Sequence, residues 1–251
     1  MMTGSPGSML KITWLAHACF LLEADGLRVL TDPYDPGIMG LPAITEPADI
    51  VIRSSADDLA HCRSDLIRGR SGTAPVTVTG TEIAGRRITI AGLTISAVEC
   101  RESAVVRADP RKNSMYRFRL AELEIAHLGD TGNAVTREQA EFLRGADVAL
   151  VPAGGPPTIE LHDLLHACRM LAFPLVIPMH FKISGAKPRM LPVNAFTSLF
   201  RPDEVEWANA SSLVVGRDLL PQTQRVVVLR SRIGDTALHR EKFAATVPPA
   251  G

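Results

Sequence analysis

The first half of the chain alternates short apolar runs with polar turns, a pattern typical of β-strands. Two of these runs, 19–24 and 27–32, are separated only by Asp25 and Gly26, a dipeptide that favours a two-residue hairpin turn. The pattern therefore predicts an antiparallel or mixed sheet. The strands predicted in this half are 10–15, 19–24, 27–32, 48–53, 75–79, 86–90, 93–99, 114–120 and 123–127.

From residue 136 onward, helical periodicity alternates with buried apolar runs. Thr136 is suited to cap a helix over 136–145, which Gly145 would end. Further helices are predicted over 158–171 and 192–200, and strands over 147–152, 174–180, 204–207 and 225–229. A β-rich half followed by a β/α half without a linker predicts two sheets packed together and flanked by helices.

Composition narrows the class of protein. Hydrophobic residues make up 46% of the 251, and 27 Lys and Arg balance 27 Asp and Glu, so no basic excess favours nucleic acid or an anionic membrane as a partner. No apolar run approaches the roughly 20 residues that span a bilayer, and MMTGSPGSM lacks the features of a signal peptide. We expect a disordered lead-in over 1–8, a single domain over 9–232 and a C-terminal tail over 233–251.

The four cysteines are scattered, and none forms a CxxC pair. This usage suits reduced thiols better than a disulfide framework, so we expect a cytoplasmic protein.

Chemistry-bearing residues occur where predicted strands end. HLGDTG (127–132) places Asp130 between two glycines after a strand, and VIPMHF (176–181) places His180 at the end of another. A carboxylate flanked by glycines can approach a ligand or metal closely. The alternatives are a turn capped by Asp130 and a structural role for His180.

Five segments together resemble one family. KITWLAHACFLLEADGLRVLTDPY, ADIVI, IAHLGDTG, ADVALVPAGGPPTI and LVIPMHF occur in the order and spacing of the metallo-β-lactamase superfamily, closest to its ascorbate-6-phosphate-lactonase-like and metal-dependent hydrolase-like branch. The resemblance implies an α/β (α+β) protein, an αββα four-layer sandwich with a metal site at one sheet edge. In such a site, a hydroxide bridging two metals attacks an ester, lactone, amide or phosphodiester.

The metal-binding loop departs from the family's pattern, His-x-His-x-Asp-His. IRSSADDLAHC (52–62) offers no equivalent set of ligands in either of two alignments, although sliding by one residue aligns His61 with the last ligand. The family's next histidine is missing as well, because that region reads ECRES (99–103). Among the ligands the resemblance implies, Asp130 and His180 remain, together with the family-typical neighbours Asp32, His17 and His127.

Two ligands are too few for zinc. We therefore expect a degenerate site with little or no standard dinuclear-zinc hydrolysis. One alternative is an active hydrolase with a rebuilt site, in which His61, Asp57 or Asp58, Cys62 and Cys100 join Asp130 and His180 if the loop folds inward. Residues 53–66 would otherwise form a solvated loop or a short helix.

Two other functions stay open: a ligand- or partner-binding module that uses the old cleft, and a metal-free hydrolase that uses Cys62 or Cys100 with His61 as the base. No tightly bound cofactor is expected, and one weakly bound zinc or manganese ion is left open. The partners left open are a small-molecule ligand in the cleft and a homo-oligomer; no nucleic acid and no membrane is expected.

Overall fold

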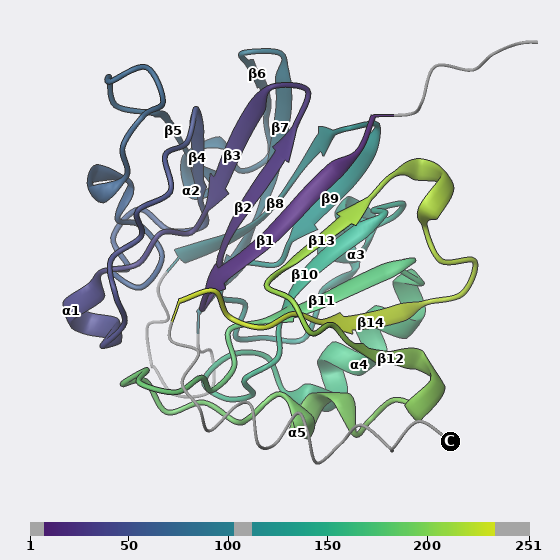
Figure 1. The fold of residues 1–251 in the computed structure, drawn as a ribbon. Coiled ribbons are helices and arrows are strands. Elements are labelled where there is room, and N and C mark those ends of the chain that lie inside the picture. The colour runs from purple at the N-terminus through teal and green to yellow at the C-terminus, as the bar shows by residue number, and fades with distance from the viewer. Residues whose placement is uncertain (1–7, 103–111, 234–251) are drawn as a thin grey trace, which may run out of the picture.

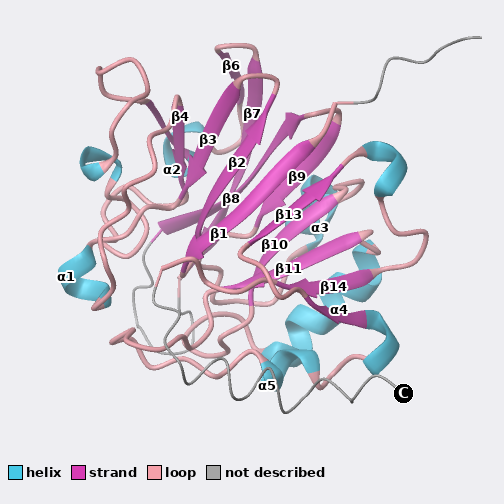
Figure 2. Ribbon diagram, viewed as in Figure 1, coloured by secondary structure: helices cyan, strands magenta, loops and turns pink. Residues whose placement is uncertain are grey.

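The apolar strands assemble into two β-sheets that lie face to face in the computed structural model, which describes residues 8–102 and 112–233 (Figures 1 and 2). One sheet has the order β13 (Ser212–Val215), β1 (Leu10–Ala16), β2 (Cys19–Ala24), β3 (Leu27–Thr31), β4 (Ile50–Arg53) and β5 (Val76–Thr79). The other has the order β12 (Val205–Trp207), β14 (Arg225–Val228), β11 (Leu175–Met179), β10 (Val148–Pro152), β9 (Leu123–His127), β8 (Lys112–Leu120), β7 (Leu93–Arg101) and β6 (Arg87–Ile90). One buried apolar core contains residues of both sheets.

The predicted hairpin is confirmed. β2 and β3 are antiparallel, and the turn between them places Asp25 and Gly26 at φ +53° and +77°, the left-handed conformation that a two-residue turn of this kind requires. β3, β4 and β5 are parallel to one another. In the second sheet β9, β10 and β11 are also parallel, so their carboxyl ends meet at the same edge.

Most of the helices lie beside the second sheet, but the first helix along the chain lies apart from it (Figure 1). The longer ones are α3 (Arg137–Leu143) and α4 (Leu161–Leu171); α1 (Pro36–Met39), α2 (Gly80–Ile83) and α5 (Asn194–Thr197) have four residues each. The predicted cap of α3 is confirmed: the Thr136 hydroxyl accepts from the N–H of Gln139, and the Gln139 side chain accepts from the N–H of Thr136.

Two predicted helices are shorter in the structure. Residues 158 and 159 precede α4, because the Thr158 hydroxyl donates to the Gly155 carbonyl and the Ile159 N–H donates to the Thr131 carbonyl. Of the helix predicted over 192–200, only α5 is α-helical. β13, α1 and α2 have four residues each and were not predicted. The two helices are too short to show a helical period, whereas β13 was missed although a strand as short as β4 was predicted.

The predicted lead-in and tail lie outside the described residues, except for Ser8 and Ile233, and the predicted domain boundaries stay a prediction. Within residues 8–102 and 112–233, no helix is long and apolar enough to cross a membrane.

Candidate metal centre

Strands of both sheets end at one edge of the molecule and bring polar residues together there. In the first sheet, His17 follows β1, Asp32 follows β3 and Ser54 follows β4. In the second, Asp130 lies three residues beyond β9 and His180 follows β11 directly. The His180 N–H donates to the His17 carbonyl at 3.0 Å, so the backbones of the two sheets are joined at this edge.

The backbone is strained at three of these residues. His17, Asp32 and His180 have φ of +54°, +37° and +52°. A side chain beyond glycine is uncommon in this region and costs of order 1–3 kcal/mol, and such strain often accompanies function.

The loop after β4 turns inward, and no helix forms over 54–63. The Asp35 N–H donates to the Leu59 carbonyl and the Arg63 N–H to the Pro33 carbonyl, so both flanks of His61 are bonded to the segment after β3. His61 is completely buried. The solvated loop or short helix predicted over 53–66 is therefore wrong for His61, although Ser64–Leu66 does form a short 3-10 helix.

His61 lies at the centre of the cluster. Its Nδ1 is 2.9 Å from Asp32 Oδ2, and its Nε2 is 3.2 Å from His17 Nε2. The same Nε2 is 3.8 Å from Asp130 Oδ2 and 4.0 Å from Asp58 Oδ2. Burial acts to lower the pKa of His61, but the hydrogen bond to Asp32 and the charges of Asp58 and Asp130 outweigh it and raise the pKa to about 10.

Asp32 is a buried carboxylate, and the groups of the described residues that hydrogen-bond to its side chain are donors. Ser54 donates to it from its N–H at 2.8 Å and from its hydroxyl at 2.5 Å, and the Tyr116 hydroxyl donates at 3.0 Å. Burial acts to raise the pKa of Asp32, while His127, His61 and Ser54 outweigh it and lower the pKa. Because the carboxylate only accepts, His61 Nδ1 carries a proton. With a pKa near 10 the ring also carries a proton on Nε2, and a bound cation would displace that proton and leave Nε2 as the ligand atom.

The other two histidines of the cluster are held neutral. Burial, followed by the charges of His180 and His61, lowers the pKa of His17 well below its usual value. Burial lowers the pKa of His180 against the opposing charge of Asp130, whose Oδ1 is 3.4 Å from His180 Nε2. Neutral imidazole is the form that binds a metal. His17 Nδ1, His180 Nδ1 and Asp130 Oδ1 are buried and have no hydrogen-bond partner among the described residues.

Glu102 is a further acid that sequence reasoning missed. It follows β7, in the ECRES segment where the family's next histidine was expected, and it is buried. Burial, a hydrogen bond with Asp58 and the charges of Asp58 and Asp130 raise the pKa of Glu102 to about 8. Three carboxyl groups therefore crowd one side of His61, an arrangement that a divalent cation would stabilise.

The structure brings some predicted residues to the cluster and leaves others out. Asp58 joins Asp130, but Asp57 is exposed and bonds only to Ser55 among the described residues. His127 uses both ring nitrogens, since Nδ1 accepts from the Gly129 N–H and Nε2 therefore donates to the Ala18 carbonyl, so it is not free to bind a metal.

Neither candidate cysteine joins the ligand groups found among the described residues. Burial raises the pKa of Cys62, and it raises that of Cys100 to about 12. A protonated thiol is a poor nucleophile and a poor ligand, so the raised pKa values disfavour both a metal-free cysteine hydrolase and metal binding by these cysteines.

The comparisons with known proteins show the family of the chain. Residues 11–180 match the family described as the β-lactamase superfamily domain. A structure from Thermotoga maritima, described as a Zn-dependent hydrolase of the metallo-β-lactamase superfamily, is 31% identical with a TM-score of 0.65, over 88% of this chain and 98% of its own. The chain belongs to the metallo-β-lactamase superfamily.

Curated relatives of this metallo-β-lactamase-fold protein carry the description metal-dependent hydrolase. One from Methanosphaerula palustris is 29% identical over 68% of this chain and 84% of its own length. One from Thermoplasma acidophilum is 28% identical over 68% of this chain and 83% of its own. The αββα sandwich predicted from the sequence is confirmed.

The candidate donor atoms form two groups that share His61. Ligand atoms of His17, His61 and His180 lie within 4.8 Å of one another, as do those of Asp58, His61 and Asp130. A tetrahedral zinc ion with Zn–N distances of about 2.0–2.1 Å separates its ligand atoms by about 3.3 Å. The separations of 3.2 Å between His17 and His61 and 3.4 Å between His180 and Asp130 are close to that value.

Proposed function

We propose that this chain is a metal-dependent hydrolase that works with one metal ion in a rebuilt ligand set: His17, His61, His180 and Asp130, with Asp58 beside them. The observation that carries this proposal is the convergence of three imidazoles and a carboxylate whose Oδ1 is buried without a hydrogen-bond partner among the described residues. A buried acceptor of this kind calls for an unseen partner such as an ion.

A single ion, rather than the family's two, follows from the role of His61. Both ligand groups contain His61, and its Nδ1 is bonded to Asp32, which leaves one nitrogen for one metal. The chain does not match the His-x-His-x-Asp-His loop or the family's next histidine, so we expect a smaller centre without standard dinuclear chemistry.

Each side chain has a separate task. Asp32 fixes the His61 tautomer and directs Nε2 towards the cluster, as outer partners of metal-bound histidines do. Asp130 and Asp58 supply the negative charge that attracts a cation, while Glu102, with its pKa near 8, becomes negative only when a cation displaces its proton. A carboxylate that does not bind the ion could accept a proton from an attacking water.

A bound zinc or manganese ion would lower the pKa of its water and polarise the carbonyl or phosphoryl group of a substrate. The description of the relatives as metal-dependent hydrolases supports this reaction class. Lactones, other esters and phosphodiesters are the substrates we would test first.

The test pairs metal binding with turnover. Wild type, His61→Ala and Asp130→Ala are titrated with Zn²⁺ and Mn²⁺, and each is assayed on a panel of lactones, esters and phosphodiesters with the metal present. His166→Ala is the matched control, because it removes an exposed imidazole of α4 that belongs to neither ligand group.

We expect about one weakly held ion per wild-type chain and a metal-dependent turnover that His61→Ala and Asp130→Ala abolish and His166→Ala preserves. Two tightly held ions would contradict the rebuilt set. Metal binding without turnover of any substrate would favour a ligand-binding module in the old cleft.

A further inference from the structure

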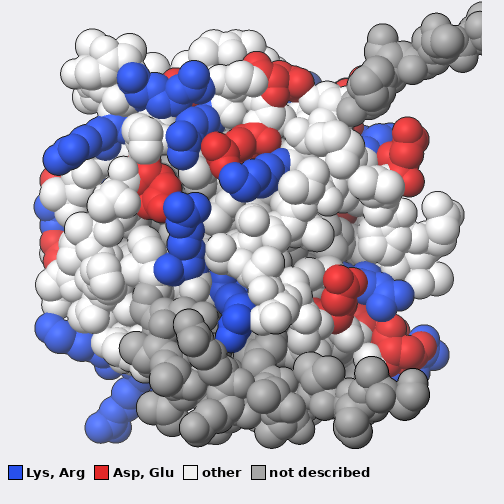
Figure 3. All heavy atoms as spheres, viewed as in Figure 1, with Lys and Arg blue, Asp and Glu red and all other residues white. Residues whose placement is uncertain are grey.

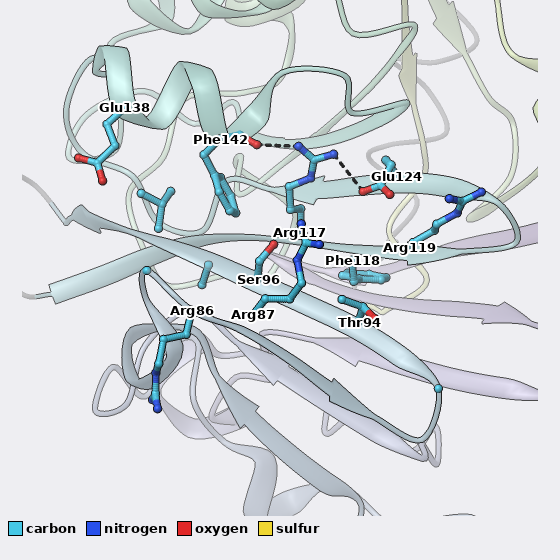
Figure 4. Close-up of a pocket in the computed structure, with 14 residues that line it drawn as sticks. Arg86, Arg87, Thr94, Ser96, Arg117, Phe118, Arg119, Glu124, Glu138 and Phe142 are labelled. Carbon is cyan, nitrogen blue, oxygen red and sulfur yellow. Dashed lines mark hydrogen bonds and ion pairs between the residues drawn. The ribbon is translucent and has the colours of Figure 1, made fainter.

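A groove of about 790 Å³ lies on the outer face of the second sheet, between α3 and the hairpin of β6 and β7 (Figure 4). It is separate from the candidate metal centre in its residues. Ser96 and Thr94 of β7 form part of its floor, and Phe142 of α3 contributes to one side. α3 covers only part of this end of the sheet, so the side chains on the outer face of the sheet are accessible here.

Arginines line the groove in register. Arg87 of β6 pairs with Ser96 of β7, and Ser96 pairs with Arg117 of β8, so two guanidinium groups flank one hydroxyl on the same face. Arg119, two residues along β8, lies on that face as well. Figure 4 shows the Arg87 side chain extending towards Arg117, with Arg119 and Thr94 to one side.

Only one of these three arginines is neutralised. Arg117 donates to the Phe142 and Arg144 carbonyls and forms an ion pair with Glu124 at 3.0 Å. No ion pair or side-chain hydrogen bond joins Arg87 or Arg119 to another residue of the described ranges, and both are exposed. Like charges held on one sheet face repel each other, so the unpaired arginines favour an anion between them.

We propose that this groove binds small molecules that carry a phosphoryl group. Guanidinium groups match the oxygens of phosphate with paired N–H donors, and the hydroxyls of Ser96 and Thr94 add neutral donors beside them. The partly buried ring of Phe142 offers an apolar surface to the organic part of a phosphate ester.

The occupant is a small molecule rather than a nucleic acid. The chain as a whole has equal numbers of basic and acidic residues, so no extended positive field follows a polymer. On the face seen in Figure 3, positive and negative side chains are mixed. Glu124 and Glu138 also line the groove, and repulsion by their carboxylates leaves room only for a compact anion.

The test is calorimetric titration of the full chain with inorganic phosphate, pyrophosphate and AMP at about 50 mM salt, where the screening of surface charges is moderate. EDTA is present, and Asp130→Ala is titrated in parallel, so that phosphate held by a metal is recognised. The variants are Arg87→Ala, Arg119→Ala and their combination. The control is Arg68→Ala, which removes an exposed arginine from the loop between β4 and β5.

We expect saturable binding of pyrophosphate or AMP, weakened at least about tenfold in the double variant and changed less than about twofold by Arg68→Ala or Asp130→Ala. Inorganic phosphate binding as tightly as AMP would also support the proposal, and it would show that recognition lies in the phosphoryl group and that Phe142 adds no affinity. The proposal would be overturned if no saturable binding were seen, or if Arg68→Ala lost as much affinity as the double variant. It would also be overturned by a loss of affinity in Asp130→Ala, or by binding of an oligonucleotide without binding of the small phosphates. Thermal unfolding of every variant verifies that it is folded.

Discussion

Replacing Asp32 with asparagine tests how the candidate metal centre is organised. Its Oδ1 accepts from the Ser54 N–H and the Tyr116 hydroxyl, and its Oδ2 accepts from the Ser54 hydroxyl and His61 Nδ1. Asparagine keeps only one oxygen, so its NH₂ group must face two atoms that now donate.

The NH₂ group is expected to take the Oδ2 position. At the Oδ1 position it would meet the Ser54 N–H, a backbone donor that cannot become an acceptor. At the Oδ2 position the Ser54 hydroxyl can turn to accept. The pKa of His61 falls once the Asp32 charge is lost, and the neutral ring can then keep its proton on Nε2 instead of Nδ1. His61 would then point an N–H at the ligand cluster and could no longer bind a metal there.

The magnitude follows from the bonds that change. Hydrogen bonds to a charged group contribute about 1.5–3 kcal/mol, so Asp32→Asn should lower the free energy of unfolding by about 2–3 kcal/mol. Loss of an outer partner typically lowers metal affinity about 10- to 100-fold, and we expect the same for Zn²⁺ or Mn²⁺. Tyr116→Phe is the control, because it removes one bond to the same carboxylate, costs about 1.5–3 kcal/mol and leaves the proton on His61 Nδ1 in place.

Urea unfolding measures the stability of each variant, competition with a chromogenic chelator measures metal affinity, and ¹⁵N NMR of the imidazoles reports the tautomer. If Asp32→Asn reverses the tautomer yet binds metal as the wild type does, His61 Nε2 is not a ligand and the reasoning fails. Equal losses of affinity in Asp32→Asn and Tyr116→Phe would point to a general loosening of the site.

Three further predictions concern the fold. Gly129→Ala should destabilise the protein by at least about 3 kcal/mol in thermal or urea unfolding, because φ is +60° and a Cβ would clash with the Ser114 carbonyl. The control Gly145→Ala, with a similar φ and nothing within 4 Å of the added Cβ, should cost about 1 kcal/mol. Equal losses in the two variants would argue against the close contact. Glu204→Gln should lower the free energy of unfolding by about 0.5–1 kcal/mol at pH 7, because hydrogen bonding with Arg169 lowers the pKa of Glu204 from 4.5 to about 2 at a partly exposed site. A lowered pKa stabilises the folded protein above pH 4.5 and loses this effect as the pH falls towards 2. A difference in stability between wild type and variant that persists at pH 2 would refute this. Burial raises the pKa of Cys100 and of Cys168 to about 12, so neither thiol should react with an aromatic disulfide at pH 8 until denaturant is added, and mass spectrometry identifies any early label.

Much of the fold could be predicted from the sequence, because alternating apolar runs and the Asp25–Gly26 turn are local signals of strands and hairpins. The juxtaposition of Asp130 and His180 could be predicted too, since parallel strands bring their carboxyl ends to one edge. β13 was missed because it forms where β1 offers free backbone groups, and a partner some 200 residues away leaves no local signal in the sequence.

The ligand set could be predicted only in part. A linear motif compares positions, whereas His61 reaches the cluster because the loop is bonded to the segment after β3 and turns inward. Sliding the motif by one residue aligned His61 with the last ligand and Asp58 with the second histidine, but it placed Ala56 and Ala60 at the other two positions. Glu102 was missed for a related reason, because an acid at a position where a histidine is expected was taken as a loss rather than as a different donor.

The pairing of β13 with β1 also constrains when the protein can fold. Leu10–Thr13 pair with Ser212–Val215, so the first sheet reaches its full width only after a segment some 200 residues downstream has been synthesised. Until then β1 offers an open edge of unpaired N–H and carbonyl groups, the kind of edge on which other chains can pair. A nascent chain leaving the ribosome would expose that edge during most of its synthesis. A chain cut before Ser212 would keep it permanently, so such truncations should aggregate even though every residue of the candidate metal centre is still present.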